Sequence, residues 1–210
     1  MTNITVFGQR PRTGIFQPPA AFAVRNDCKV GVWKIGDKQR LNGQVMQMSI
    51  LRVHQMFGTL GNTQDAIWLQ VWFVAGPDCE VNVPKNTVCM TYVKKQSLDN
   101  LYATVVQAMS GKDPGVGIFE ARFSERSGNY GTYYVLDWTW REREDGAEVA
   151  QLEDIAAFLA TEPAFFDQAT SANLRCIDGW DSDQIQELIA NAQTDRRLAA
   201  EREAALKQAA

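Results

Sequence analysis

The chain has 210 residues, of which 45% are hydrophobic and 22% are charged, so it can bury a substantial core. A chain of this length holds one ordinary domain, or one domain with a large appendage. No apolar run is long enough to cross a bilayer, and the first residues, MTNITVFGQRPR, lack the apolar segment of a signal peptide. We therefore expect a cytoplasmic protein.

The net charge of −4 is unevenly distributed along the chain. Residues 1–143 carry 16 Lys and Arg against 11 Asp and Glu, whereas residues 144–210 carry 5 against 14. Residues 1–40 alone hold 7 basic and 2 acidic residues. This asymmetry predicts a basic surface that meets an anion, and an acidic C-terminal part. If that acidic part competes with the anion, truncation after Arg143 is expected to tighten binding at low salt.

The cysteines are widely spaced, and none forms a Cys-x-x-Cys pair; they are Cys28, Cys79, Cys89 and Cys176. His54 is the only histidine, so a zinc site would have to be gathered from remote segments. The pattern predicts reduced structural thiols, with no metal and no cofactor.

Residues 1–40 are expected to form an extended basic arm. Glycines and prolines interrupt regular structure at Gly8, Pro11, Gly14, Pro18 and Pro19. Aromatic residues, including Phe22 and Trp33, lie between the basic residues, and we expect them to pin the arm to the domain.

Residues 41–143 read as a domain of five strands and one helix. The first strand, about residues 43–57, changes phase, because Met46 and Met48 share one parity while Leu51 and Val53 share the other. Such a change indicates a β-bulge or a sharp bend. The predicted elements that follow are strands at about 66–75 and 87–95, a helix at 97–110, and a β-hairpin at 117–143 with a turn at 127–131.

The hairpin places four large apolar residues on one face of its second strand, namely Tyr134, Leu136, Trp138 and Trp140. We interpret them as core. The helix at 97–110 has Ser97 as its expected N-cap and Gly111 at its expected C-terminal stop.

Residues 144–210 form an acidic helical region. One helix is predicted over 148–159, and Asp181 with Gln184 resembles a capping box that opens a second. The last residues, TDRRLAAEREAALKQAA, favour a helix but offer little to bury. They are either a solvated extension or a contact for another chain.

The order of five strands, with one helix between the third and the fourth, resembles the OB-fold over about residues 40–143. The resemblance is closest to bacterial and phage single-stranded DNA-binding proteins. It implies an α+β chain that is mainly β: a five-stranded OB-like β-barrel with an N-terminal arm and a C-terminal helical appendage. It also implies binding of single-stranded nucleic acid, with DNA favoured over RNA, across the second and third strands.

Carried over by position, the binding residues would stack on bases or neutralise phosphates. They are Trp68, Gln70, Trp72, Tyr92, Lys94, Lys95, Arg122, Arg126, Tyr130 and Tyr133. Stacking tolerates every base, so little sequence specificity is expected.

Two alternatives stay open. Trp68 and Trp72 could be buried under the C-terminal helices, which need a surface to cover. The protein could instead be a structural or adaptor component of a larger phage or defence assembly, using the arm and the last helix for self-association or for a protein partner. An enzyme is not expected: the phosphate-loop, dinucleotide, zinc-protease and serine-hydrolase motifs are absent from the sequence, and a cysteine nucleophile such as Cys89 would depend on His54 as its base.

Overall fold

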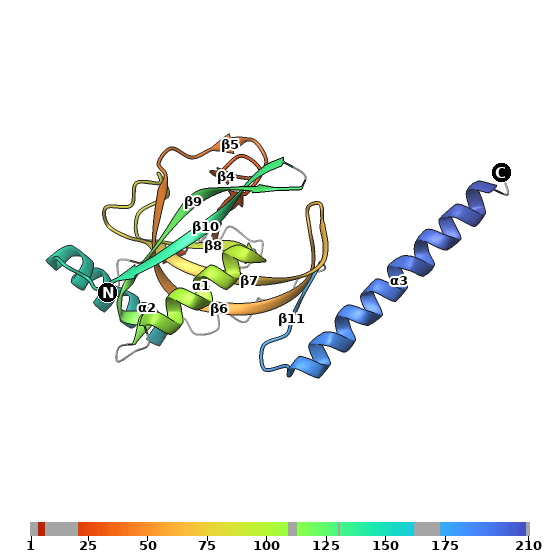
Figure 1. Ribbon diagram of the computed structural model, residues 1–210. Helices are drawn as coiled ribbons and strands as arrows, with labels where there is room; N and C mark the ends of the chain where they lie inside the picture. The colour runs from red at the N-terminus through yellow and green to blue at the C-terminus, as the bar shows by residue number, and fades with distance from the viewer. Residues whose placement is uncertain (1–3, 7–20, 109–112, 130, 162–172, 209–210) are drawn as a thin grey trace, which may run out of the picture.

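A computed structural model describes residues 4–6, 21–108, 113–129, 131–161 and 173–208 (Figure 1). The chain is a mixed α and β structure. Its strands are β1 (Thr5–Val6), β2 (Phe22–Ala23), β3 (Arg25–Asp27), β4 (Val32–Ile35), β5 (Gln39–Arg40), β6 (Val45–Leu60), β7 (Thr63–Ala75), β8 (Thr87–Lys94), β9 (Ile118–Gly128), β10 (Gly131–Arg141) and β11 (Leu174–Cys176). Its helices are α1 (Gln96–Ala108), the short 3₁₀ turn η1 (Pro114–Val116), α2 (Gly146–Thr161) and α3 (Ser182–Gln208).

The main sheet has the order β1-β8-β7-β6-β9-β10, and β11 and β2 join it on β6 and β8. Strand β6 is the central element, since it pairs with β7 along its length and with β9 and then β11 on its other side. The predicted bulge is confirmed: Ile50 pairs with Phe73 and Arg52 with Trp72, which leaves Leu51 as the extra residue. Gly61, with a φ of 55°, allows a tight turn between β6 and β7.

The predicted β-barrel is wrong, because the sheet is open. In the described residues β8 and β10 do not pair, and helix α1 lies along the free edge of β10 instead. The backbone N–H of Leu136 donates to the Ser97 hydroxyl at 2.9 Å, and the Asn100 amide donates to the Leu136 carbonyl at 3.1 Å. The Thr104 hydroxyl donates to the Trp138 carbonyl at 3.1 Å. Side chains of α1 therefore satisfy the backbone groups that a closing strand would have paired.

The other edge of the sheet is occupied as well. Strands β1 and β2 pair with β8 in parallel, and the N–H of Val24 donates to the Met90 carbonyl at 2.8 Å. The second half of the predicted arm is therefore not extended. It forms the small antiparallel sheet β3-β4-β5, and Trp33 at 0% exposure packs against Phe123 with ring centroids 5.2 Å apart. The expectation that its aromatics anchor this segment is confirmed for Trp33.

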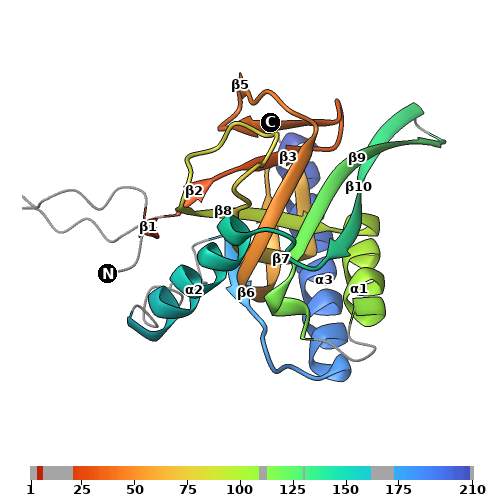
Figure 2. The same ribbon diagram turned by 90° about the vertical axis from the view of Figure 1, so that its left-hand side faces the viewer.

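The two faces of the sheet bury different clusters. The larger core lies on the face toward α1 and the β9–β10 hairpin, and it contains Trp33, Phe73, Leu136 and Trp138. On the opposite face, α2 covers Trp72 and Val88 with Ile155 and Phe158. Figure 2 shows α1 and α2 on opposite sides of β6 and β7. The interpretation of Leu136 and Trp138 as core is confirmed, while Tyr134 and Trp140 are half-buried.

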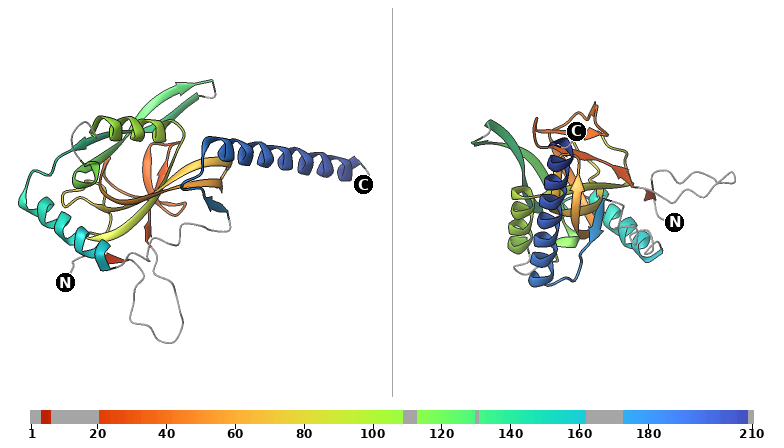
Figure 3. Two further views of the ribbon diagram at one scale, coloured as in Figure 1. Left: turned by 90° about the horizontal axis from the view of Figure 1, so that it is seen from below. Right: turned by 90° about the vertical axis from the view of Figure 1, so that its right-hand side faces the viewer.

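The predicted capping box opens α3. The N–H of Gln184 donates to the Asp181 carboxylate at 2.8 Å, and the N–H of Asp181 donates to the Gln184 side-chain carbonyl at 3.0 Å. After its first turns α3 extends away from the sheet (Figures 1 and 3). None of the helices in the described part of the chain is both long and apolar enough to span a membrane.

Candidate nucleic-acid interface

The predicted binding residues on β7 and β8 do share one face of the sheet. Trp68 lies opposite Lys94 in the β7–β8 register, and Gln70 lies opposite Tyr92. The Lys94 ammonium lies 4.8 Å from the centroid of the Trp68 ring, a cation–π contact, and also bonds the Thr63 hydroxyl. The sequence therefore grouped these residues correctly in space.

Burial removes the stacking surface predicted for this face. Trp68, Gln70 and Trp72 are only 6%, 2% and 5% exposed. Leu174 of β11 packs with Trp68, and α2 packs on Trp72. The Gln70 amide is fully engaged, since it donates to the Tyr92 hydroxyl at 2.8 Å and accepts from the Trp72 indole at 3.0 Å. These three side chains act as packing in this structure, as the alternative interpretation expected for the tryptophans.

Of the predicted binding residues in the β9–β10 hairpin, one has its charge compensated by a carboxylate and others are exposed to solvent. The Arg126 guanidinium lies 3.0 Å from the Asp137 carboxylate, so its charge is compensated. Arg122 is exposed, with Glu120 at 3.9 Å. Tyr133 is 39% exposed, and its hydroxyl donates to the Gln96 side chain at 3.4 Å, next to the start of α1. Tyr130 lies outside the described residues.

A cluster of cations surrounds the end of β8. The positive charges that act on Lys94 are those of Lys95, Arg25 and Lys29, which lie immediately before α1, in β3 and in the β3–β4 turn. Two contacts fix that turn: the Asn26 amide donates to the Tyr92 carbonyl at 2.7 Å, and the N–H of Tyr134 donates to the Cys28 carbonyl at 2.8 Å. We call Arg25, Lys29, Lys94 and Lys95 the cationic cluster.

The cationic cluster holds more positive charge than its surroundings compensate. Of the four residues of the cluster, only Arg25 has a carboxylate of the described residues within ion-pair distance, the exposed Asp37 at 2.5 Å. Burial lowers the pKa of Lys94, and the positive charges of Lys95, Arg25 and Lys29 lower it further. Lys95 also lies at the N-terminus of α1, where the helix dipole adds partial positive charge. An anion at this position would relieve the repulsion.

Sequence reasoning found Lys94 and Lys95 but did not place Arg25 and Lys29 with them. The signal for these two residues is the excess of basic residues in 1–40, which by itself predicts only a basic arm. Asp27 does not offset the cluster fully, because its carboxylate accepts from Lys34 at 2.7 Å and from the N–H of Lys29 at 3.1 Å. Burial would raise the pKa of Asp27, but these bonds outweigh it and lower the pKa.

A second group of chemically active side chains lies where β11 meets β6. The His54 imidazole Nδ1 lies 2.6 Å from the Asp178 carboxylate, and the thiol of Cys176 also bonds that carboxylate. Sequence reasoning offered Cys89 as the partner of His54. Cys89 instead packs in the larger core with Phe73, where burial raises the pKa of its thiol to about 12. A thiol with this pKa is protonated and is not a nucleophile.

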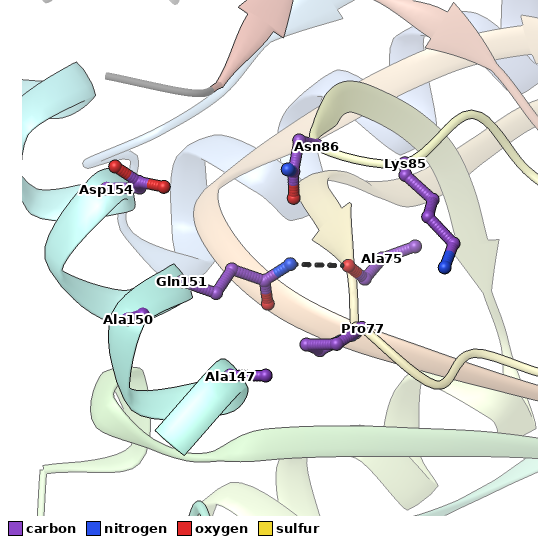
Figure 4. A pocket seen from close by; sticks show the side chains of 9 residues that line it. Ala75, Pro77, Lys85, Asn86, Ala147, Ala150, Gln151 and Asp154 are labelled. Carbon is purple, nitrogen blue, oxygen red and sulfur yellow. Dashed lines mark hydrogen bonds between the residues drawn. The ribbon is translucent and has the colours of Figure 1, made fainter. Parts of the chain in front are cut away.

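One cavity, of about 250 Å³, lies between α2 and the segment that connects β7 to β8 (Figure 4). Lys85, Asn86 and Asp154 line it. The Gln151 amide, which also faces it, donates to the Ala75 carbonyl at 2.9 Å and accepts from Ser49 at 3.1 Å. The cavity is smaller than the usual small-molecule site, and Gln151 is engaged in holding α2 on the sheet.

Comparison with protein-family models, with curated proteins and with solved structures finds no match for this chain. The resemblance to single-stranded DNA-binding proteins therefore stays a prediction.

Proposed function

We propose that the protein binds single-stranded nucleic acid at the cationic cluster, without catalysis and with little sequence preference. The observation that carries the proposal is the convergence of Arg25, Lys29, Lys94 and Lys95 at the end of β8, with no carboxylate of the described residues paired to the three lysines. When such lysines neutralise the phosphates of a strand, the counterions condensed on the strand are released, and this release favours binding.

The site departs from the sequence-based prediction in its stacking residues. Trp68 and Trp72 are buried, so the proposal places a base on the exposed ring of Tyr133. The Tyr133–Gln96 contact keeps that ring beside the start of α1, next to Lys95. One base on an aromatic ring is worth about 1–3 kcal/mol, and every base has a face that can stack. DNA is favoured over RNA only through the resemblance given above.

The test is fluorescence anisotropy of a labelled single-stranded oligonucleotide, titrated at several salt concentrations and repeated with the duplex. Three phosphate contacts, one at each lysine without a carboxylate partner, predict a slope of log K against log salt of about −2.1 on a single strand. The double variant Lys29→Gln/Lys95→Gln is expected to change this slope to about −0.7. Its matched control is Lys38→Gln/Lys85→Gln, which removes the same charge from exposed lysines that are not among the charges acting on Lys94.

Absence of binding by the folded protein at low salt would contradict the proposal. Equal weakening in the two double variants would show that net charge alone, and not the cationic cluster, sets the affinity.

A second candidate, assembly with another copy of this chain, is favoured by the exposure of α3. Leu198 and Leu206 are 41% and 72% exposed, and the helix carries charges of both signs that suit an antiparallel copy. Light scattering during size exclusion tests it: a dimer that becomes monomeric in Leu198→Glu/Leu206→Glu supports it, and a strict monomer of the full chain opposes it.

A further inference from the structure

We propose that His54, Cys176 and Asp178 form a binding site for a divalent metal ion of the zinc class, a role that the proposed nucleic-acid binding neither requires nor supplies. The donor atoms of these three side chains all lie within 4.8 Å of one another. They comprise an imidazole nitrogen, a thiol sulfur and a carboxylate oxygen, a set that suits Zn²⁺ and similar borderline-soft ions.

The strand register brings the three donors together. Cys176 pairs with Met56 in the antiparallel β6–β11 ladder, and the ladder continues with the N–H of Ile177 donating to the Gln55 carbonyl at 2.8 Å. Two residues beyond Cys176, Asp178 therefore faces His54, which lies two residues before Met56. The N–H of Gln55 donates to the Asp178 carboxylate at 2.6 Å and holds the carboxylate beside the ring. The site is thus positioned by backbone contacts.

The His54 ring presents one particular nitrogen to the site. Its side chain is 4% exposed, and Nδ1 lies 2.6 Å from the Asp178 carboxylate. An ion held together with Asp178 and Cys176 would therefore bind Nδ1 and replace the hydrogen bond between the imidazole and the carboxylate. The other ring nitrogen, Nε2, points away from Asp178 and would carry the proton.

Solvent can reach the site from the side of Asp178, whose side chain is 43% exposed. A bound ion would take Cys176 as thiolate and release the thiol proton to solvent, and water would complete the coordination. The ion would join β6 to the segment that leads into α3. Its position distinguishes it from the cationic cluster, because the two sites share no residue.

The experiment uses the full chain, stripped of metal with a chelator and titrated with Co²⁺ and Zn²⁺. We expect one ion per chain, with a thiolate-to-cobalt charge-transfer band in the absorption spectrum. Cys176→Ser should abolish the band, and Asp178→Asn should weaken Zn²⁺ binding by about 10-fold or more, as measured by competition with a chromophoric chelator. Cys28→Ser is the matched control, since Cys28 is likewise a half-buried cysteine outside any disulfide, and it should keep the band.

Circular dichroism of each variant establishes that it is folded. Cys176 and Asp178 are not buried, so their variants keep the test valid even if His54→Gln fails to fold. No stoichiometric binding by the wild type, or a charge-transfer band that survives Cys176→Ser, would overturn the proposal.

Discussion

The ion pair between Arg141 and Glu148 is predicted to hold α2 on the sheet. Arg141 ends β10 and Glu148 lies in the first turn of α2, and the two groups make a bidentate contact at 2.6 and 2.9 Å. Glu148 is only 3% exposed, and it also accepts from the N–H of Glu144 at 2.8 Å. Breaking a buried pair costs about 3–5 kcal/mol. Because Arg141 is 28% exposed and keeps Glu120 at 3.3 Å, we expect Glu148→Gln to cost about 2–3 kcal/mol.

The pH dependence of this loss identifies its cause. The bonds from Arg141 lower the pKa of Glu148 below its ordinary value, against the effect of burial. A carboxyl group with a lowered folded pKa stabilises the native state above its unfolded pKa, and that contribution is lost as the pH falls through the folded pKa. At neutral pH the free energy of unfolding of the wild type should therefore exceed that of Glu148→Gln by the full 2–3 kcal/mol estimated above, about the cost of the lost ion pair. In acid the free energies of unfolding of the two proteins should converge.

Urea denaturation at a series of pH values measures this difference. The control Glu144→Gln removes an exposed carboxylate four residues away and should change the free energy of unfolding by less than about 0.5 kcal/mol. A Glu148→Gln loss that stays constant from neutral to acid pH would refute the electrostatic reasoning and leave packing as the cause.

Two further predictions concern the edge of β10 and the cationic cluster. Ser97→Ala leaves the buried N–H of Leu136 without its acceptor and should destabilise the protein by about 1–3 kcal/mol in urea denaturation, whereas the exposed Ser127→Ala should not. An equal effect of both would contradict the role given to Ser97. Because the pKa of Lys94 is lowered in the free protein, a bound phosphate favours its charged form, and affinity for a single-stranded oligonucleotide should fall as the pH rises toward the ordinary pKa of lysine. Lys94→Arg keeps its charge over this range, so its anisotropy titrations should show the smaller fall; identical pH profiles would argue against a phosphate at Lys94.

The elements that could be predicted from the sequence are those fixed by local pattern. Alternation of apolar residues predicted β6, β7 and β8, and the parity change near Leu51 predicted the bulge that the register shift confirms. The capping box at Asp181 and Gln184 was predicted because both of its hydrogen bonds join residues three apart. Each of these features depends on residues close together in the chain.

Closure of the sheet could not be predicted in this way. Ser97 was expected to cap its own helix, yet the carbonyl of Lys95 accepts the first N–H groups of α1, and the Ser97 hydroxyl accepts from β10. Whether another strand or a helix occupies the edge of β10 depends on contacts between residues that are about forty positions apart in the sequence, such as Ser97 and Leu136. The strand order alone does not distinguish an open sheet from a barrel.

The candidate sites show the same limit. Lys94 and Lys95 were predicted, while Arg25 joins them only because Val24 and Asn26 bond to β8. His54 and Cys176 come together through the β6–β11 register, which no spacing in the sequence indicates. In each case the missing information is a pairing between distant segments, and the residue types themselves were visible.

The acidic C-terminal region has a role in the fold besides the one that its charge predicts. Its charge predicts that it competes with an anionic ligand for the basic surface, and that truncation after Arg143 removes this competition. In the structure its apolar residues Ile155 and Phe158 cover Trp72 and Val88, and Leu174 covers Trp68. Exposing this apolar face to water would cost roughly 25 cal/mol for each Å² uncovered, and the truncation would also remove the partner of Arg141. The region therefore belongs to the fold: it covers the sheet face that the resemblance assigns to nucleic acid, and it leaves the end of β8, with the cationic cluster, as the part of that neighbourhood that an anionic strand can reach.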